Sequence, residues 1–169
     1  MVTTGNIELH RGLSGVYLDR TESCFIDGTV GKLQYRGYDI HDLAEKSTTE
    51  EVVYLLLYNK LPNTKELAVF DAQLKANRTV PSEVLDIVDK VKKAHPMDVL
   101  RTAVSALAAF DPEVADNSIE ATIRKGLRLT SLAPTIVAAH DRMRKGLSPV
   151  PPSQTLNHAG NFLYMLFGK

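Results

Sequence analysis

The stretch FIDGTVGKLQYRGYDIHDLA, residues 25–44, decides the fold class because it places three glycines in twenty residues. A glycine-rich loop of this kind either cradles a phosphate or forms the turn of a β-hairpin. The Asp27-Gly28 dipeptide and the alternating polar and apolar residues 32–35 are typical of a hairpin. The glycines fit neither GxxxxGK[ST] nor GxGxxG, and helical patterns follow instead of the βαβ context that those motifs need. The sequence therefore favours a hairpin over a phosphate-binding loop.

Strand character is confined to the region around this stretch. Apolar residues at Val16–Leu18 and at Cys24–Ile26 precede the Asp27-Gly28 turn, and we expect both to be extended. No strand pattern occurs further along the chain. The predicted fold class is all-α with a short N-terminal β-hairpin.

The rest of the chain has the periodicity and the end signals of helices. Ser47 and Glu50 have the spacing of a capping box, and the apolar run EVVYLLLY at 51–58 predicts a fully buried helix. Further helices are expected from Asn63, from Pro81 or Ser82, over 97–110, over 118–145 and from about Leu156 to the end.

Three of these helices have unusual features. The helix over 97–110 is rich in alanine, which allows a close approach of a second helix, and its predicted buried stripe is Leu100, Val104 and Leu107. The helix over 118–145 contains Pro134, which predicts a kink. In the last helix, apolar residues continue to Phe167, and we expect them to require a partner surface.

Composition excludes several functional classes. Twenty basic residues balance twenty acidic residues, which predicts neither a nucleic-acid partner nor an anionic membrane surface. No apolar run is long enough for a transmembrane helix, and the opening MVTTGNIELHRG lacks a signal-peptide pattern. The single cysteine, Cys24, suits a reducing compartment. We expect a soluble, cytoplasmic protein.

The chain carries no recognisable catalytic or metal-binding motif. Its histidines lack the close spacing of a zinc site, and no serine lies in a GxSxG elbow. His140 and Asp141 are adjacent on a helix and point about 100° apart, so they cannot act as a base and its orienting group. The histidines are His10, His41, His95, His140 and His158. From these residues we predict no catalytic residue, no metal and no cofactor.

The opening stretch, extended to residues 12–62, resembles the start of citrate synthases of the bacterial and archaeal type. HPMDVLRTAVSALAAFDPE at 95–113, LAPTIVA at 132–138 and NHAGNFLYML at 157–166 are similar to the next landmarks of that family, in the same order. The resemblance covers the chain from Gly12 onward. YRGYDI together with HPMDVLRTAVS is its most specific part.

This resemblance implies that residues 1–169 are the N-terminal part of a mainly helical large domain, without the small domain and the C-terminal half. Members of the family condense acetyl-CoA, as a substrate, with oxaloacetate, and they work as dimers whose helices stack across the interface. The helices 97–110 and 118–145 match elements of that interface, so a homo-oligomer is expected. The missing C-terminal half is a further expected partner.

The catalytic groups of the family lie in a HADHE-like motif, a GFGHR-like motif and a later aspartate, and none of these has a counterpart here. His158, in NHAGN, belongs to an earlier landmark. The 169-residue chain alone is therefore predicted to be an inactive portion of an acyltransferase. Arg36, in YRGYDI, is the residue that we expect near substrate or coenzyme; the alternative is a structural hydrogen bond from the hairpin to the first helix.

The sequence leaves open two alternatives to a portion of a citrate synthase. The first is a non-catalytic, citrate-synthase-like module that assembles with a partner. The second is a 2-methylcitrate synthase, a relative that uses propionyl-CoA and shares the same landmarks.

Overall fold

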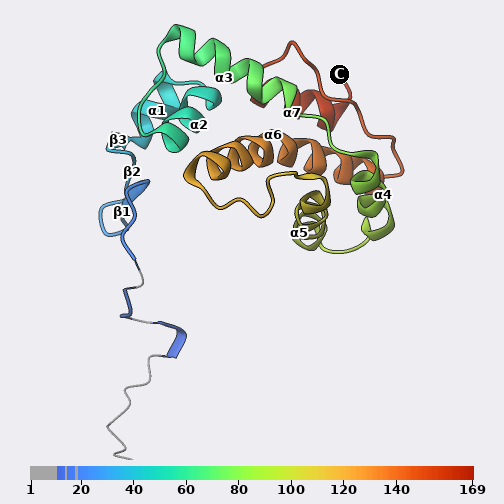
Figure 1. The fold of residues 1–169 in the computed structure, drawn as a ribbon, viewed down its shortest axis with the longest axis horizontal. Helices are drawn as coiled ribbons and strands as arrows, with labels where there is room; N and C mark the ends of the chain where they lie inside the picture. The colour runs from blue at the N-terminus through green and yellow to red at the C-terminus, as the bar shows by residue number, and fades with distance from the viewer. Residues whose placement is uncertain (1–10, 14, 18) are drawn as a thin grey trace, which may run out of the picture.

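The computed structural model describes residues 11–13, 15–17 and 19–169, and over these residues the chain is mainly helical with one small sheet (Figure 1). This confirms the predicted fold class. The elements of the described chain, in order, are η1 Arg11–Leu13, β1 Cys24–Asp27, β2 Lys32–Tyr35, β3 Tyr38–Asp39, α1 Ile40–Lys46, α2 Thr49–Tyr58, α3 Thr64–Ala76, α4 Ser82–Val91, α5 Pro96–Leu107, η2 Ala108–Phe110, α6 Ile119–Arg144 and α7 His158–Phe167. The opening residues MVTTGNIELH, with His10, and also Ser14 and Leu18, lie outside the described residues.

The predicted hairpin is present as β1 and β2, which pair antiparallel with Asp27 opposite Lys32. Asp27 Oδ1 accepts a hydrogen bond of 2.9 Å from the Thr29 N–H, which fixes the start of the turn. The prediction of a strand at Val16 and Tyr17 is wrong, because neither residue belongs to a strand. No described segment pairs with these two residues, so their β propensity has no partner strand to satisfy.

A third strand, β3, was not predicted. It pairs antiparallel with β2 through a two-residue turn formed by Arg36 and Gly37. Both turn residues have positive φ, 49° and 86°, as a type I′ turn requires. The usual sequence signal for this turn is Asn-Gly or Asp-Gly, and Arg-Gly does not give it.

The predicted capping box lies one residue further along. Thr48, not Ser47, is the N-cap of α2; its Oγ1 accepts from the Glu51 N–H at 3.3 Å, and the Glu51 carboxylate accepts from the Thr48 N–H at 2.7 Å. Ser47 instead terminates α1. The sequence SerThrThrGluGlu allows either register, and the observed one turns Glu50 inward, where its side chain is buried.

The prediction that α2 is fully buried is wrong. Tyr54 and Leu55 are buried, but the other apolar side chains of the helix are half-buried and Tyr58 is exposed. The helix contacts α3 and α7, and its Val53 and Leu57 pack beside Leu127 of α6, so its remaining surface is only partly covered. Figure 1 shows α2 next to α3.

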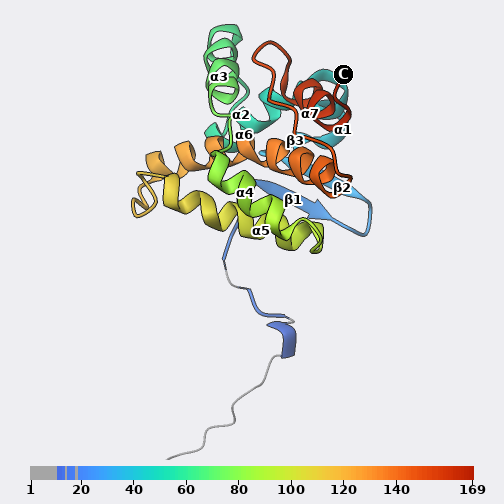
Figure 2. The same ribbon diagram turned by 90° about the vertical axis from the view of Figure 1, so that its right-hand side faces the viewer.

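The helix α6 runs through the middle of the molecule. In both views α4 and α5 lie along one side of it, and α3 and α7 lie along the other (Figures 1 and 2). The main core forms between α4, α5 and α6, and it includes Val84, Val88, Val99, Ala103 and Ile136. The buried stripe of α5 is therefore Val99, Ala103 and Leu107; Leu100 is half-buried beside it, and Val104, predicted to be inside, is exposed.

The ends of α6 are those that the sequence predicts. Ser118 caps its start, and its 26 residues continue through Pro134. At its end the Leu147 N–H donates to Arg142 O and the Gly146 N–H to Met143 O, with Gly146 at a φ of 75°, which is a Schellman motif. Among the described residues, none of the helices combines the length and apolar character needed to cross a bilayer.

Candidate functional site: the α5–α6 face and the polar joint at α7

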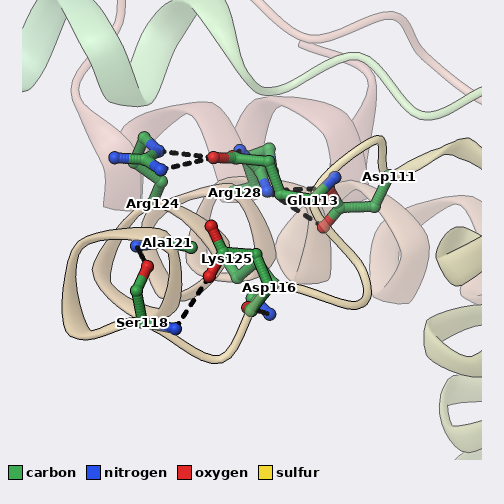
Figure 3. Close-up of polar contacts among 8 residues, drawn as sticks. All are labelled: Asp111, Glu113, Asp116, Ser118, Ala121, Arg124, Lys125 and Arg128. Atoms are coloured by element: carbon green, nitrogen blue, oxygen red, sulfur yellow. Dashed lines mark hydrogen bonds and ion pairs between the residues drawn. The ribbon is translucent and has the colours of Figure 1, made fainter.

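The loop between α5 and α6 is held on α6 by a network of ion pairs (Figure 3). Arg128 Nη2 donates to both carboxylate oxygens of Asp111, at 2.8 and 2.9 Å, and Nη1 donates to Glu113 at 2.7 Å. Arg124 Nε donates to the other oxygen of Glu113 at 2.8 Å. Since the two arginines are one helical turn apart, α6 presents both guanidinium groups to the same loop.

These contacts shift the carboxyl groups toward the ionised form. Hydrogen bonds from Arg124 and then Arg128 lower the pKa of Glu113 to about 2. The pKa of Asp111 is also lowered, first by the Glu113 backbone N–H and then by Arg128. Both acids are therefore ionised at neutral pH, and the network acts as a fixed brace for the loop rather than as a proton donor or acceptor.

The same loop also caps α6 (Figure 3). Ser118 Oγ accepts from the Ala121 N–H at 3.3 Å, and Asp116 Oδ1 accepts from the Ser118 N–H at 2.9 Å. Lys125 Nζ donates to the Asp116 carbonyl. The N-terminus of α6 is thus fixed by side chains of the preceding loop and of the first two turns of the helix.

A cavity of about 480 Å³ opens beside this brace, between the α3–α4 link, the end of α5, the loop and α6. Its lining is mostly apolar and includes Val104, Phe110 and Leu129, which are exposed. Its cations, Lys125 and Arg128, already bind Asp116, Asp111 and Glu113. The cavity therefore suits an apolar side chain better than a charged substrate.

The outward face of α5 carries small and polar side chains. Arg101, Thr102, Ser105 and Ala106 line a shallow groove of about 450 Å³. A helix with small residues on its outer face can be approached closely by another helix. This face and the exposed Leu129 and Val137 of α6 are the surfaces over 97–110 and 118–145 where the sequence predicts association.

Arg36, the predicted site residue, connects the sheet to α2. Its backbone N–H donates to Ser23 O at 3.0 Å, and its Nη2 donates to Leu56 O at 3.3 Å. Nη1 lies 3.9 Å from the exposed Glu22 carboxylate. Because Leu56 is in the last turn of α2, this bond satisfies a carbonyl that has no partner within the helix. The structural alternative is thus observed, since α2 is the first helix that the sequence predicts; a role near substrate or coenzyme stays a prediction.

The described histidines do not form one group. His95 caps α5, where its Nδ1 accepts from the Met97 N–H at 3.3 Å. His140 Nε2 lies 3.1 Å from the Lys92 carbonyl, and the neighbouring Asp141 instead binds Arg144 and Lys145. Within the described residues, no set of three His, Cys, Asp or Glu side chains is placed to hold a metal.

A polar joint, formed by Glu50, Arg78 and His158, was not predicted from the sequence. Arg78 lies in the α3–α4 link with 0% of its surface exposed, and its Nη1 donates to Ser153 O at 2.7 Å and Leu156 O at 2.9 Å. Glu50, 6% exposed, accepts from the His158 N–H at 2.6 Å. These bonds join α2, the α3–α4 link and the start of α7 across 75 to 108 residues of sequence.

Burial lowers the pKa of His158, and the Arg78 cation lowers it further while Glu50 partly opposes them. The imidazole is therefore neutral at neutral pH. No local sequence pattern could have revealed the joint, because each of its bonds depends on the tertiary packing of distant segments.

A family model described as "Citrate synthase, C-terminal domain" matches residues 12–169. The chain belongs to the citrate synthase family. The match covers the strands, all the described α-helices, the ion network of the α5–α6 loop and the polar joint, so these features are parts of a citrate synthase fold.

Individual relatives agree with this membership. The citrate synthase of Haloferax volcanii is 42% identical over 167 residues, which cover 96% of this chain and 44% of the relative. The 2-methylcitrate synthase of Mycobacterium tuberculosis is 40% identical over 163 residues, which cover 96% of this chain and 41% of the relative. The chain thus spans less than half the length of the curated relatives that it matches.

The crystal structure of citrate synthase from Pyrobaculum aerophilum is similar in fold, with a TM-score of 0.87 and 38% identity. The similarity covers 99% of this chain and 46% of that one. Citrate synthase architecture therefore extends over nearly the whole chain.

Proposed function

We propose that this chain is the N-terminal part of the large domain of a citrate synthase, the acyltransferase that condenses acetyl-CoA with oxaloacetate to give citrate and CoA. The observation that carries the proposal is the likeness to the Pyrobaculum aerophilum enzyme, which covers 99% of this chain and only 46% of that enzyme. The order of the sequence landmarks supports the N-terminal position. A cytoplasmic location and the absence of a bound cofactor belong to the same proposal.

Within such an enzyme, the chain supplies scaffold rather than reacting groups. His95 caps α5, His140 bonds to the Lys92 carbonyl, and the His158 backbone N–H donates to the Glu50 carboxylate. The ion network over residues 111–128 braces a loop and leaves its cations engaged. The small-residue face of α5 and the exposed apolar residues of α6 support association of two copies, and the exposed Leu163 and Phe167 of α7 support contact with the missing half.

A 2-methylcitrate synthase is the second candidate. The 40% identity to the Mycobacterium tuberculosis protein of that name is close to the 42% identity to the Haloferax volcanii citrate synthase. This part of the chain therefore does not separate acetyl-CoA from propionyl-CoA as the thioester substrate.

Complementation tests the proposal. The pure chain, mixed with acetyl-CoA and oxaloacetate, is expected to release no thiol. Co-expression with the portion of the Haloferax volcanii enzyme that lies beyond the matched region is expected to restore thiol release. Turnover by the chain alone contradicts the scaffold role, and a stable but inactive complex favours the non-catalytic assembly module.

The same experiment with the corresponding portion of the Mycobacterium tuberculosis enzyme addresses the thioester. Restoration only with this portion, and with propionyl-CoA preferred over acetyl-CoA, assigns the chain to the 2-methylcitrate synthases. Restoration only with the Haloferax volcanii portion, and with acetyl-CoA preferred, assigns it to the citrate synthases.

A further inference from the structure

The polar joint at α7 contains buried hydrogen-bonding atoms that the protein itself does not satisfy. Arg78 Nε and Nη2 are buried and have no hydrogen-bond partner among the described residues. His158 Nδ1 is likewise buried without a hydrogen-bond partner among the described residues. Buried polar atoms in folded proteins are nearly always paired, either with protein or with ordered water, because an unpaired one costs free energy.

The three side chains of the joint meet at the start of α7. Arg78 donates to the carbonyl of Leu156, the residue before the N-cap Asn157, and Glu50 accepts from the N–H of His158, the first residue of the helix. Arg78 and Glu50 are also the two charged groups that act on the His158 imidazole. The unsatisfied donors and the unsatisfied imidazole nitrogen therefore belong to one cluster rather than to separate sites.

The charges of the joint favour a neutral ligand. Arg78 is the only cation of the cluster, and the carboxylates of Glu50 on α2 and Asp71 on α3 both act on it. An added anion would meet these two carboxylates and could not donate to His158 Nδ1. A water molecule accepts from an arginine N–H and donates two protons, which matches the hydrogen-bonding capacity around it.

We infer that the polar joint binds at least one internal water, which accepts from Arg78 Nε or Nη2 and donates to His158 Nδ1 and to the Glu50 carboxylate. The water accepts a hydrogen bond from a fully buried guanidinium group whose Nε and Nη2 otherwise lack acceptors, and it connects the α3–α4 segment to α7. His158 is held in the tautomer with its proton on Nε2, since Nδ1 accepts the water proton. This inference is independent of the enzymatic activity of the chain.

An atomic-resolution crystal structure of the 169-residue chain tests the inference directly. We expect solvent density within hydrogen-bonding distance of both Arg78 and His158 Nδ1. Dry packing around these atoms, or a direct bond between Arg78 and Glu50 that removes the need for water, overturns the inference. A crystal soaked in bromide distinguishes the ligand class, because anomalous signal at the joint identifies an anion and likewise overturns it.

Solution measurements give a second test. Nitrogen-15 NMR is expected to show His158 Nδ1 without a proton, and Arg78 Hε is expected to show a cross-peak to a long-lived water. In Arg78→Met, checked for folding by circular dichroism, the water should be lost; in the matched variant Lys90→Met, on an exposed cation of α4, it should remain. If Arg78→Met does not fold, the wild-type spectra decide, and a protonated Nδ1 or a missing water cross-peak contradicts the inference.

Discussion

The two ends of α6 are anchored by charged residues in opposite ways. At the N-terminal end, the ion network of Asp111, Glu113, Arg124 and Arg128 lies near the surface. Toward the C-terminal end, Thr135 donates to the carbonyl of Arg78 at 2.9 Å, and the Arg78 side chain is fully buried in the polar joint. The network has several ion pairs that are partly exposed to solvent, whereas the joint has few bonds in the buried interior.

This difference shows that the number of ion pairs is a poor guide to their importance. Exposed pairs contribute little, because water and salt compete for both charges. Removal of one member of a buried cluster leaves its partners desolvated and uncompensated, which is strongly destabilising. We therefore expect the polar joint to contribute more to stability than the larger network.

The largest expected effect is that of Arg78→Met. The variant leaves the carbonyls of Ser153 and Leu156 without their donor and the buried Glu50 without its cation, and it should lose about 3 kcal/mol of unfolding free energy in urea titrations. The control Lys90→Met, on an exposed side chain of α4, should change little. Equal losses in the two variants would contradict the importance assigned to the joint.

Arg128→Met should have a smaller effect, less than half that of Arg78→Met. It breaks the bonds to Asp111 and Glu113, but both acids remain partly accessible to water. The loss should shrink further as salt is added, since screening weakens exposed pairs in the wild type. Urea titrations at low and high ionic strength measure this loss of unfolding free energy. A loss that is large and independent of salt would mean that the network contributes as much to stability as the joint.

His158 should make stability depend on pH near neutrality. The pKa of His158 in the folded chain is lowered from the ordinary value of 6.5. The contribution of its neutral imidazole to the free energy of unfolding is therefore fully present above pH 6.5 and is lost as the pH falls through the lowered value. The charged groups that act here are Glu50 on α2 and Arg78 in the α3–α4 link, with Asp71 on α3 acting on Arg78. Urea midpoints of His158→Gln should fall less than wild type on acidification, whereas His41→Gln, on an exposed histidine, should follow wild type.

The smallest expected effect is that of Glu113→Gln, and it is present above pH 4.5 and disappears in acid. With a folded pKa of about 2 against an ordinary value of 4.5, Glu113 contributes stability above 4.5 that is lost as the pH falls toward 2. Thermal unfolding as a function of pH should therefore be less steep in the variant between these values. Identical profiles would mean that the arginine contacts of Glu113 do not persist in solution.

The contrast also explains what the sequence could predict. The features around the network are local: Ser118 caps α6, Asp111-Pro112 follows the helix before it, and Gly146 closes the Schellman motif. Each depends on residues within a few positions of one another. Sequence patterns therefore predicted the fold class, the hairpin and most helix ends.

The polar joint and the third strand could not be predicted in this way. Arg78 binds residues 75 and 78 positions later, and Glu50 binds a residue 108 positions later. The register of the α2 cap, one residue from the prediction, depends on the burial of Glu50 beside α7. Arg36-Gly37 forms a type I′ turn with an arginine at positive φ, which local preferences disfavour.

The mass of the chain in solution tests most directly the central claim, that this portion is a scaffold that self-associates through α5 and α6. Sedimentation equilibrium should give about twice the chain mass of 18.6 kDa. Ser105→Arg, in the α5 groove, should shift the chain to a monomer, while Asp86→Arg, on the exposed side of α4, should not. A wild-type chain that stays a stable monomer at high concentration would contradict the claim.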